Sequence, residues 1–293
     1  MQTGKLGAGR VRAPTPVLAL LAGLAMLFGL AINFGEAVVG RTGPALHDHD
    51  RRDIGEENHA AGPGGLAVAS QGYVLRPRNT RFIAGEYETF RFGIFSSDGK
   101  PVVDFARRGD HQMTLIVVRR DMTGYQHLYP VMDHNGTWTV PLDLEDPGSY
   151  RAFAEFLPGT AKTPVILGVD LDAPGFFEPG PISKESTSAD VDGYKVIWTG
   201  NLIAGTVSRI WVHVMRDNLP VNDLDPILGG GARLVILREG DLAYLNARPV
   251  GGLRQETATD FDVEVPTTGY YRMFLEFQHH GQLRTVEFTA LAR

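Results

Sequence analysis

The sequence contains no cysteine, which excludes a disulfide framework, a thiolate metal site and a cysteine nucleophile. The fold must therefore be held together by packing alone. Lysine is scarce, with five residues against 23 arginines, a bias typical of bacteria with GC-rich genomes. The chain also lacks the nucleophile, zinc-protease, phosphate-loop and dinucleotide motifs of common enzyme families in a fitting context. The sequence therefore predicts a protein without catalytic activity.

Excess positive charge is missing from most of the chain. The formal net charge is −6, and three of the 28 basic residues, Lys5, Arg10 and Arg12, come before the first acidic residue. The remainder sets 25 basic residues against 34 acidic ones, a charge of −9. Because nucleic acids and anionic lipid surfaces attract basic proteins, we expect no nucleic-acid partner for this part.

Long hydrophobic runs are missing as well, except for one in residues 13–34. Its apolar part reaches about 27 Å as a helix, just enough to span a bilayer core of roughly 30 Å. A retained anchor is favoured over a cleaved signal peptide, since Gly35-Glu36-Ala37 is a mediocre cleavage site. The basic residues in 1–12 predict a cytoplasmic start, so we expect a single-pass protein of the cell membrane with its C-terminal part outside.

The rest of the chain divides by composition. Residues 35–65 are polar, rich in glycine and without periodicity, which predicts a flexible stalk. Two segments with many short apolar runs follow, and a Pro-rich and Gly-rich stretch separates them. The expected domains are a first β-sandwich at 66–172, a linker at 173–190 and a second β-sandwich at 191–293.

An internal repeat relates the two segments. An offset of 119 places residues 114–119 (TLIVVR) on 233–238 (RLVILR) and Tyr125 on Tyr244. An offset of 121 places residues 148–156 on 269–277, where Gly, Tyr, Arg, Phe, Glu and Phe recur in register. Agreement at this density indicates a duplicated domain.

Each copy contains about seven short apolar or alternating runs bounded by Gly, Pro, Asp and Asn, which predicts strands joined by turns. Seven strands at this spacing favour an all-β fold of two tandem immunoglobulin-like β-sandwiches after one N-terminal transmembrane helix. The expected strands lie near residues 72–76, 87–95, 113–119, 125–129, 137–142, 149–156 and 164–171, and near 193–198, 206–215, 232–238, 243–247, 261–265, 270–277 and 284–290.

A local motif supports the sandwich. Asp146-Pro-Gly-Ser-Tyr150 has the spacing of a tyrosine corner, in which a Tyr at the start of a late strand hydrogen-bonds to upstream backbone. Gly269-Tyr-Tyr271 repeats the motif without the acidic residue. Both copies are therefore expected to form the corner.

One cluster offers a chemical interpretation, in the first copy. Imidazole and thioether groups together suit copper, and His111 and Met113 are two residues apart, so they share one face of a strand. Whether His127 or His134 joins them depends on the hairpin register, which the sequence leaves open. The candidate metal ligands are thus His111, Met113, His127 and His134; the alternative is histidine on a solvated surface and methionine as core filler.

Several runs resemble a known group of proteins. Residues 111–121, 124–130, 136–138 and 237–244 are similar to uncharacterised actinobacterial membrane-anchored proteins with tandem immunoglobulin-like domains. That group is distantly similar to the YtkA-like and CopC-like extracytoplasmic copper-handling domains. The resemblance implies a copper connection for the first copy. This chain carries Met113 or Thr114, Tyr129, Asn246 and Arg248 where the group tends to carry further histidines.

Two functions are therefore expected as alternatives. One is a membrane-anchored, extracytoplasmic protein that binds or handles copper through its first domain. The other is a module without metal that docks an unidentified protein of the cell envelope through exposed sheet edges or hairpin loops.

Overall fold

The computed structural model describes residues 63–293 except residues 160, 182, 228–230, 246 and 251–259. The predictions for segments 1–12 and 13–34, and for most of 35–65, lie outside the described residues. Within the described part, the regular secondary structure consists of strands, which confirms the all-β prediction. No helix in that part is long and apolar enough to cross a membrane.

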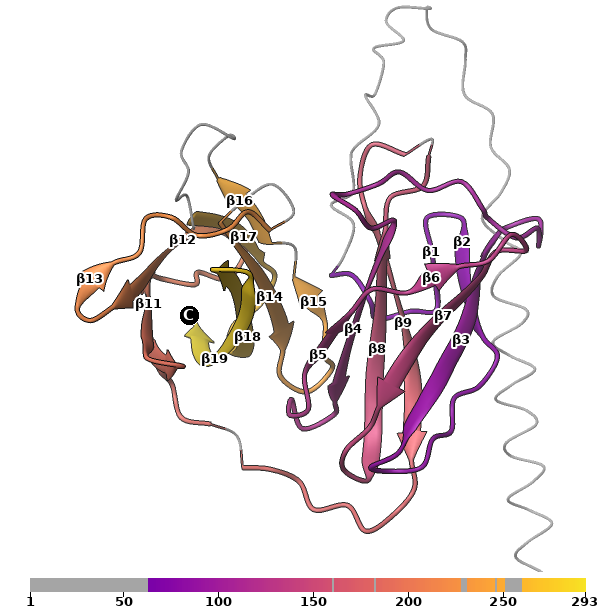
Figure 1. The fold of residues 1–293 in the computed structure, drawn as a ribbon, viewed down its shortest axis with the longest axis horizontal. Helices are drawn as coiled ribbons and strands as arrows, with labels where there is room; N and C mark the ends of the chain where they lie inside the picture. Colours follow the sequence, from indigo (N-terminus) through magenta and orange to yellow (C-terminus); the bar gives the residue numbers. More distant parts are fainter. Residues whose placement is uncertain (1–62, 160, 182, 228–230, 246, 251–259) are drawn as a thin grey trace, which may run out of the picture. The chain divides into compact units, whose positions relative to one another are not determined.

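The first copy forms a two-sheet sandwich, which we call sandwich 1 (Figure 1). One sheet, the back sheet, has the order β1-β2-β3-β7-β6, and the other, the front sheet, has the order β5-β4-β8-β9. The strands are β1 (Ala69–Ser70), β2 (Tyr73–Pro77), β3 (Tyr87–Ser96), β4 (Met113–Arg119), β5 (Gln126–Leu128), β6 (Val131–Met132), β7 (Thr137–Asp143), β8 (Gly148–Phe156) and β9 (Val165–Ala173).

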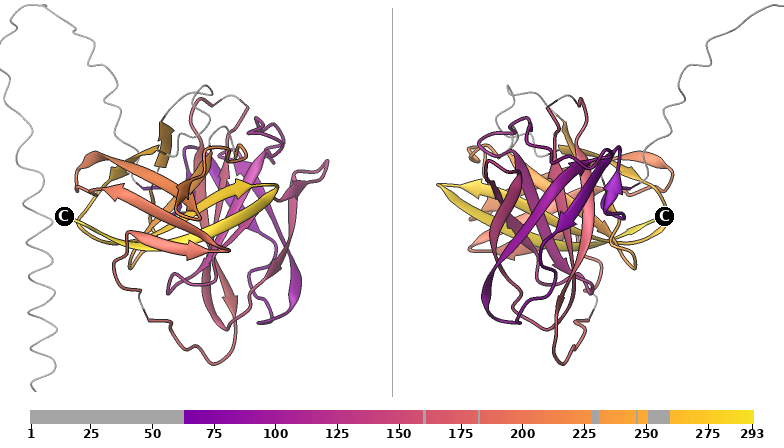
Figure 2. Two further views of the ribbon diagram at one scale, coloured as in Figure 1. Left: turned by 60° about the vertical axis from the view of Figure 1, so that its left-hand side comes forward. Right: turned by 90° about the vertical axis from the view of Figure 1, so that its right-hand side faces the viewer.

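The second copy repeats this architecture as sandwich 2. Its back sheet has the order β10-β11-β12-β17-β16, with β13 paired to β12, and its front sheet has the order β15-β14-β18-β19. The yellow hairpin of β18 and β19 can be followed in Figure 2. The strands are β10 (Ser188–Val191), β11 (Tyr194–Gly200), β12 (Thr206–Arg216), β13 (Leu219–Pro220), β14 (Ala232–Arg238), β15 (Tyr244–Leu245), β16 (Ala247–Val250), β17 (Asp260–Val265), β18 (Gly269–His279) and β19 (Gln282–Ala292).

The strand order is that of immunoglobulin sandwiches. If β2 to β9 are lettered A, B, C, C′, D, E, F and G, the back sheet reads A-B-E-D and the front sheet reads C′-C-F-G. Sandwich 2 gives the same order with β11, β12, β17 and β16 against β15, β14, β18 and β19. The duplication in the sequence is therefore a duplication of topology.

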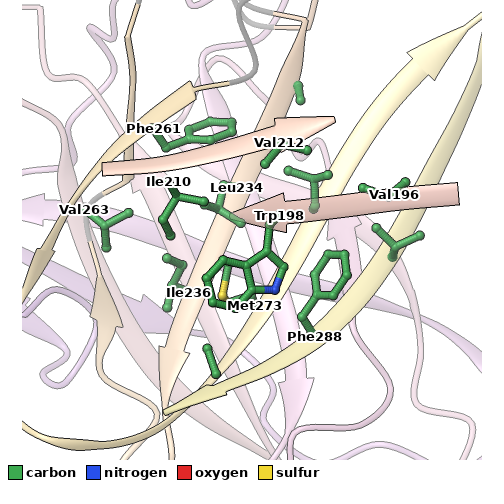
Figure 3. Packing of buried hydrophobic residues seen from close by; sticks show 14 of the residues in the cluster. Val196, Trp198, Ile210, Val212, Leu234, Ile236, Phe261, Val263, Met273 and Phe288 are labelled. Atoms are coloured by element: carbon green, nitrogen blue, oxygen red, sulfur yellow. The ribbon is translucent and has the colours of Figure 1, made fainter. Parts of the chain in front are cut away.

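Alternation of apolar and polar residues positions each core. In β12, Ile210 and Val212 point inward and are buried, whereas Trp211 between them is exposed. Figure 3 shows Trp198 of the back sheet pointing toward Met273 and Phe288 of the front sheet. Each sandwich thus has its own core between its two sheets.

The predicted strand segments all contain observed strands, with ends that differ by a few residues. The short strands β1, β6, β10 and β13 were not expected, because two to four residues carry no readable periodicity. Strand β10 begins at Ser188, inside the predicted linker 173–190, because its backbone pairs with β11. The linker between β9 and β10 accordingly comprises residues 174–187.

Both tyrosine corners are present. The hydroxyl of Tyr150 donates to the carbonyl oxygen of Asp146 at 2.7 Å, and the hydroxyl of Tyr271 donates to that of Thr267 at 2.8 Å. Each bond joins the first residues of strand F to the turn before it, which fixes the connection between the two sheets. The acidic residue of the first motif is therefore not needed for the corner.

Replacing either corner tyrosine by phenylalanine should lower the free energy of unfolding by about 1 kcal/mol, because a buried carbonyl loses its donor. Tyr150→Phe and Tyr271→Phe should behave alike in urea denaturation. Tyr87→Phe is the matched control, since Tyr87 is 83% exposed and should show no measurable change. An effect of Tyr150→Phe no larger than that of the control would contradict the prediction.

Candidate functional site

The largest functional feature of the described chain is an interface between the two front sheets. Strands β4 and β14 are buried almost throughout, although one face of a sandwich strand normally meets solvent. Their outward residues pack across the interface in one apolar cluster, and most of its members have no exposed surface. The cluster consists of Ile116, Val118, Met122, Phe153, Val235, Leu237, Leu242, Tyr244 and Phe274.

Residues that are equivalent in the repeat meet across this interface in reciprocal pairs. The ring of Tyr125 stacks on Phe274 with centroids 4.2 Å apart. The equivalent pair, Tyr244 and Phe153, has centroids 5.6 Å apart. The contact is therefore isologous in kind, as in a twofold dimer, although one chain supplies both halves.

Two glutamates, also equivalent in the repeat, lie at the polar margin of the cluster. Glu155 accepts a hydrogen bond at 2.9 Å from Arg233 of the opposite sandwich and also pairs with Arg108. Arg233 further donates to the hydroxyl of Thr114 at 3.3 Å. Because Arg233 is 9% exposed, this ion pair is largely shielded from water and couples the sandwiches more strongly than a surface pair would.

The second glutamate, Glu276, is neutralised differently. Its carboxylate accepts hydrogen bonds from the hydroxyl of Tyr125 at 3.2 Å and from Nδ1 of His127 at 2.6 Å. Nε2 of His127 lies 3.3 Å from Arg233, which can only donate. His127 is therefore the neutral tautomer with its proton on Nδ1, and it links both carboxylates through Arg233.

The electrostatics keep each group in the protonation state that these bonds need. Burial raises the pKa of Glu155, but the charges of Arg233 and Arg108 lower it further, so the net pKa lies below the ordinary value. Burial, followed by the charge of Glu276, raises the pKa of Tyr125 well above its usual value. Burial and the charge of Glu155 likewise raise the pKa of Tyr244. Both phenols therefore stay protonated and can donate to the carboxylates.

Residues 63–67, which we call the N-terminal strap, cross the same interface. Gly64 and Tyr244 exchange two backbone hydrogen bonds of 3.0 Å, which ties the strap to sandwich 2. Gly65 donates to the carbonyl of Ile166 at 3.1 Å, and Ala67 accepts from the amide of Gly168 at 2.9 Å, which ties it to sandwich 1. The end of the predicted stalk 35–65 is thus ordered by backbone bonding that its composition did not reveal.

The strap docks on one copy only, and two positions explain why. The guanidinium of Arg151 donates twice to the carbonyl of Gly65, at 2.6 and 3.1 Å. A Cβ on Gly168 would lie 1.9 Å from that carbonyl oxygen, so only glycine leaves room. In sandwich 2 the equivalent residues are Arg272 and Glu287, and they pair with each other. Glu287 thus takes the place that the strap carbonyl has in sandwich 1.

The structure does not bring the four predicted metal ligands together. Met113 is buried in the core of sandwich 1, and His134 is exposed at the turn before β7. His127 pairs with Ile116 in the β4–β5 register, so it projects from the face opposite Met113. His111 stacks on Tyr129 at 3.6 Å between centroids. The hairpin register, which the sequence left open, separates the methionine from the histidines.

Copper binding by the remaining histidines stays a prediction. Any affinity for Cu(I) or Cu(II) in the full chain should be unchanged in Met113→Leu, because the thioether faces the sandwich core. His111→Ala should remove the affinity if His111 is a ligand. Titration of both variants beside the wild type tests this, and a loss of Cu(I) affinity in Met113→Leu would contradict the placement.

The interface residues were missed in the sequence, although two signals pointed to them. Residues 114–118 and 234–237 are nearly continuous apolar runs, which predict strands covered on both faces. Glu155 and Glu276 interrupt otherwise apolar strands at equivalent positions, a pattern typical of buried ion pairs. Together these signals predict a covered front sheet with internal charge pairing.

Solved structures with similar arrangements include bacterial surface proteins. The adhesin FdeC of Escherichia coli is 12% identical over 78% of this chain and 66% of its own, with a TM-score of 0.25. The alpha-2-macroglobulin of Salmonella is 12% identical over 78% and 15%, with a TM-score of 0.26. An invasin described as a bacterial integrin-binding protein is 14% identical over 74% and 39%, with a TM-score of 0.21. This chain spans less than two thirds of each, and at these scores the fold assignment rests on strand order.

No curated protein matches the chain. A family model described as a domain of unknown function (DUF8832) matches it twice, over residues 68–170 and 189–293. The two matches confirm the internal repeat and the tandem arrangement that the resemblance implied, whereas the link to copper-handling domains stays a prediction. The chain therefore belongs to the DUF8832 family and carries its domain once in each sandwich.

Proposed function

We propose that this protein is a non-enzymatic interaction module of the cell envelope, held at the membrane by residues 13–34 with both sandwiches outside. The interface supports the idea of one rigid binding unit. Interfaces between domains of a chain are normally modest and polar and allow relative motion. Here an apolar cluster and two neutralised carboxylates hold the sandwiches together.

An exposed row on the back sheet of sandwich 2 carries the proposal. In β12, Trp211 is 43% exposed and Val207 is 56% exposed, and both point away from the core. Thr199 of β11 pairs with Trp211 and faces the same way. Tryptophan is enriched among the residues that dominate binding energy at protein interfaces. This row is therefore the proposed contact surface for an envelope protein.

Site-specific cross-linking tests the proposal. A photoreactive amino acid at Thr199, in the full chain produced in its own membrane, should give a discrete cross-linked species. Trp211→Ala in the same protein should reduce that species by about an order of magnitude, because such a residue typically contributes 2 kcal/mol or more.

The control uses an aromatic residue of similar exposure on the other sandwich. Tyr87→Ala should leave the cross-linked species unchanged, since Tyr87 lies on β3 and not on the row. Equal yields from Trp211→Ala and the wild type would rule out this surface.

A further inference from the structure

The interface between the sandwiches does not depend on which chain supplies each half. Its hydrogen bonds, ion pairs and ring contacts join residues 64–155 on one side to residues 233–276 on the other. The described linker residues take no part in these contacts. Sandwich 1 of one chain could therefore meet sandwich 2 of another with every contact preserved, including the bonds from Gly64 to Tyr244.

The charges specify that unlike sandwiches pair. Two copies of sandwich 1 would bury two Glu155 carboxylates without the Arg233 that neutralises them. Two copies of sandwich 2 would bring Arg233 against its own counterpart, because Arg233 contacts Thr114, which is its equivalent in the repeat. Both like pairings place unmatched or repelling charge in a shielded site, so sandwich 1 with sandwich 2 is preferred.

The linker is anchored at both ends and short between them. The amide of Gly180 donates to Asp121 at 2.7 Å, and the guanidinium of Arg119 lies over the ring of Phe177, which fixes the first part to sandwich 1. The amide of Ser186 donates to Thr289 at 3.0 Å, which fixes the last part to sandwich 2. Residues 181–185 alone separate these anchors, a reach of about 17 Å when extended.

We propose that two copies of this chain exchange sandwiches, sandwich 1 of each pairing with sandwich 2 of the other, to form a closed dimer with two identical interfaces. The partner for this surface is a second copy of the chain, which goes beyond the binding of an envelope protein. A twofold exchange closes on itself and leaves no unpaired face. Anchoring of both copies in one membrane favours the exchange by raising their effective concentration.

Two charge-reversed chains test the proposal directly. Glu155→Arg and Arg233→Glu each place like charges opposite one another within a single chain. Co-produced with different tags as full chains in one membrane, they can form a mixed dimer in which one interface has the native pair and the other has the reversed pair. Co-purification of the two tags from detergent should exceed that of either variant with itself by at least tenfold. Equal co-purification would overturn the proposal.

A second variant answers the question even if the charge reversals do not fold. Deleting residues 181–185 changes no residue of either core but removes the reach that lets one chain close on itself. The full chain with this deletion should double its mass by light scattering in detergent, whereas a monomeric product would overturn the proposal. The cross-linking at Thr199 reports the envelope partner separately, because the back sheet lies outside the exchanged interface.

Discussion

Arg233→Met should lower the free energy of unfolding by about 3–5 kcal/mol, the cost of breaking a buried ion pair by removing one partner. The variant keeps the length of the side chain, so the loss reports the missing guanidinium. Glu155 would retain only Arg108, and Nε2 of His127 would lose its donor. Urea denaturation of the full chain, followed by tryptophan fluorescence, measures the change.

Arg209→Met is the matched control for this prediction. Arg209 makes a bidentate pair with Asp262, at 2.7 and 3.0 Å, on the exposed face of the back sheet. Exposed pairs contribute at most about 1 kcal/mol, so the control should be mild. If Arg233→Met were no more destabilising than Arg209→Met, the interface would not hold the sandwiches through this pair.

Combining Arg233→Met with Glu155→Leu should restore part of the lost stability. The double variant leaves no unpaired charge at this position, and buried ion pairs replaced by apolar residues are often neutral or stabilising. The recovery relative to the two single variants gives the coupling between the side chains. A strictly additive loss would indicate that the two residues act independently.

The fold was accessible from the sequence because it is written in local patterns. Alternation in residues 206–215 marks one buried face, and the spacing from Asp146 to Tyr150 marks a corner that needs no distant residue. The repeat then doubled the weight of each observation. Local signals of this kind survive without knowledge of which strands pair.

The site was less accessible, since it depends on relations between strands. His111 and Met113 share a spacing that suggested a common face, but the pairing of His127 with Ile116 sets the outcome, and a shift by one residue would reverse it. The contact of Tyr125 with Phe274 joins residues that are far apart in sequence. The same duplication that produced the repeat also produced two complementary faces, which a search within one copy could not reveal.

Gly168→Ala should release the N-terminal strap from both sandwiches, although it adds a single methyl group. The new Cβ would lie 1.9 Å from the carbonyl oxygen of Gly65, far inside van der Waals contact, and that oxygen is held by two bonds from Arg151. Gly168 has no left-handed backbone, so the effect would be steric alone. We expect the amide of Tyr244, which donates to Gly64, to exchange with solvent at least tenfold faster, equivalent to about 1.4 kcal/mol of local stability.

Gly65→Ala approaches the same contact from the other side, because its Cβ would lie 2.3 Å from Cδ1 of Phe153. Gly65 has a φ of 73°, so part of its cost is conformational, and Gly72→Ala controls for that part. Gly72 has a φ of 80° and nothing within 4 Å of an added Cβ. We therefore expect Gly72→Ala to lose about 1–2 kcal/mol of stability without faster exchange at Tyr244. Protection of Tyr244 that persists in Gly168→Ala would show that the strap is not what shields it, whereas its loss in both strap variants and not in Gly72→Ala would place the membrane-proximal end of the chain in the lock between the sandwiches.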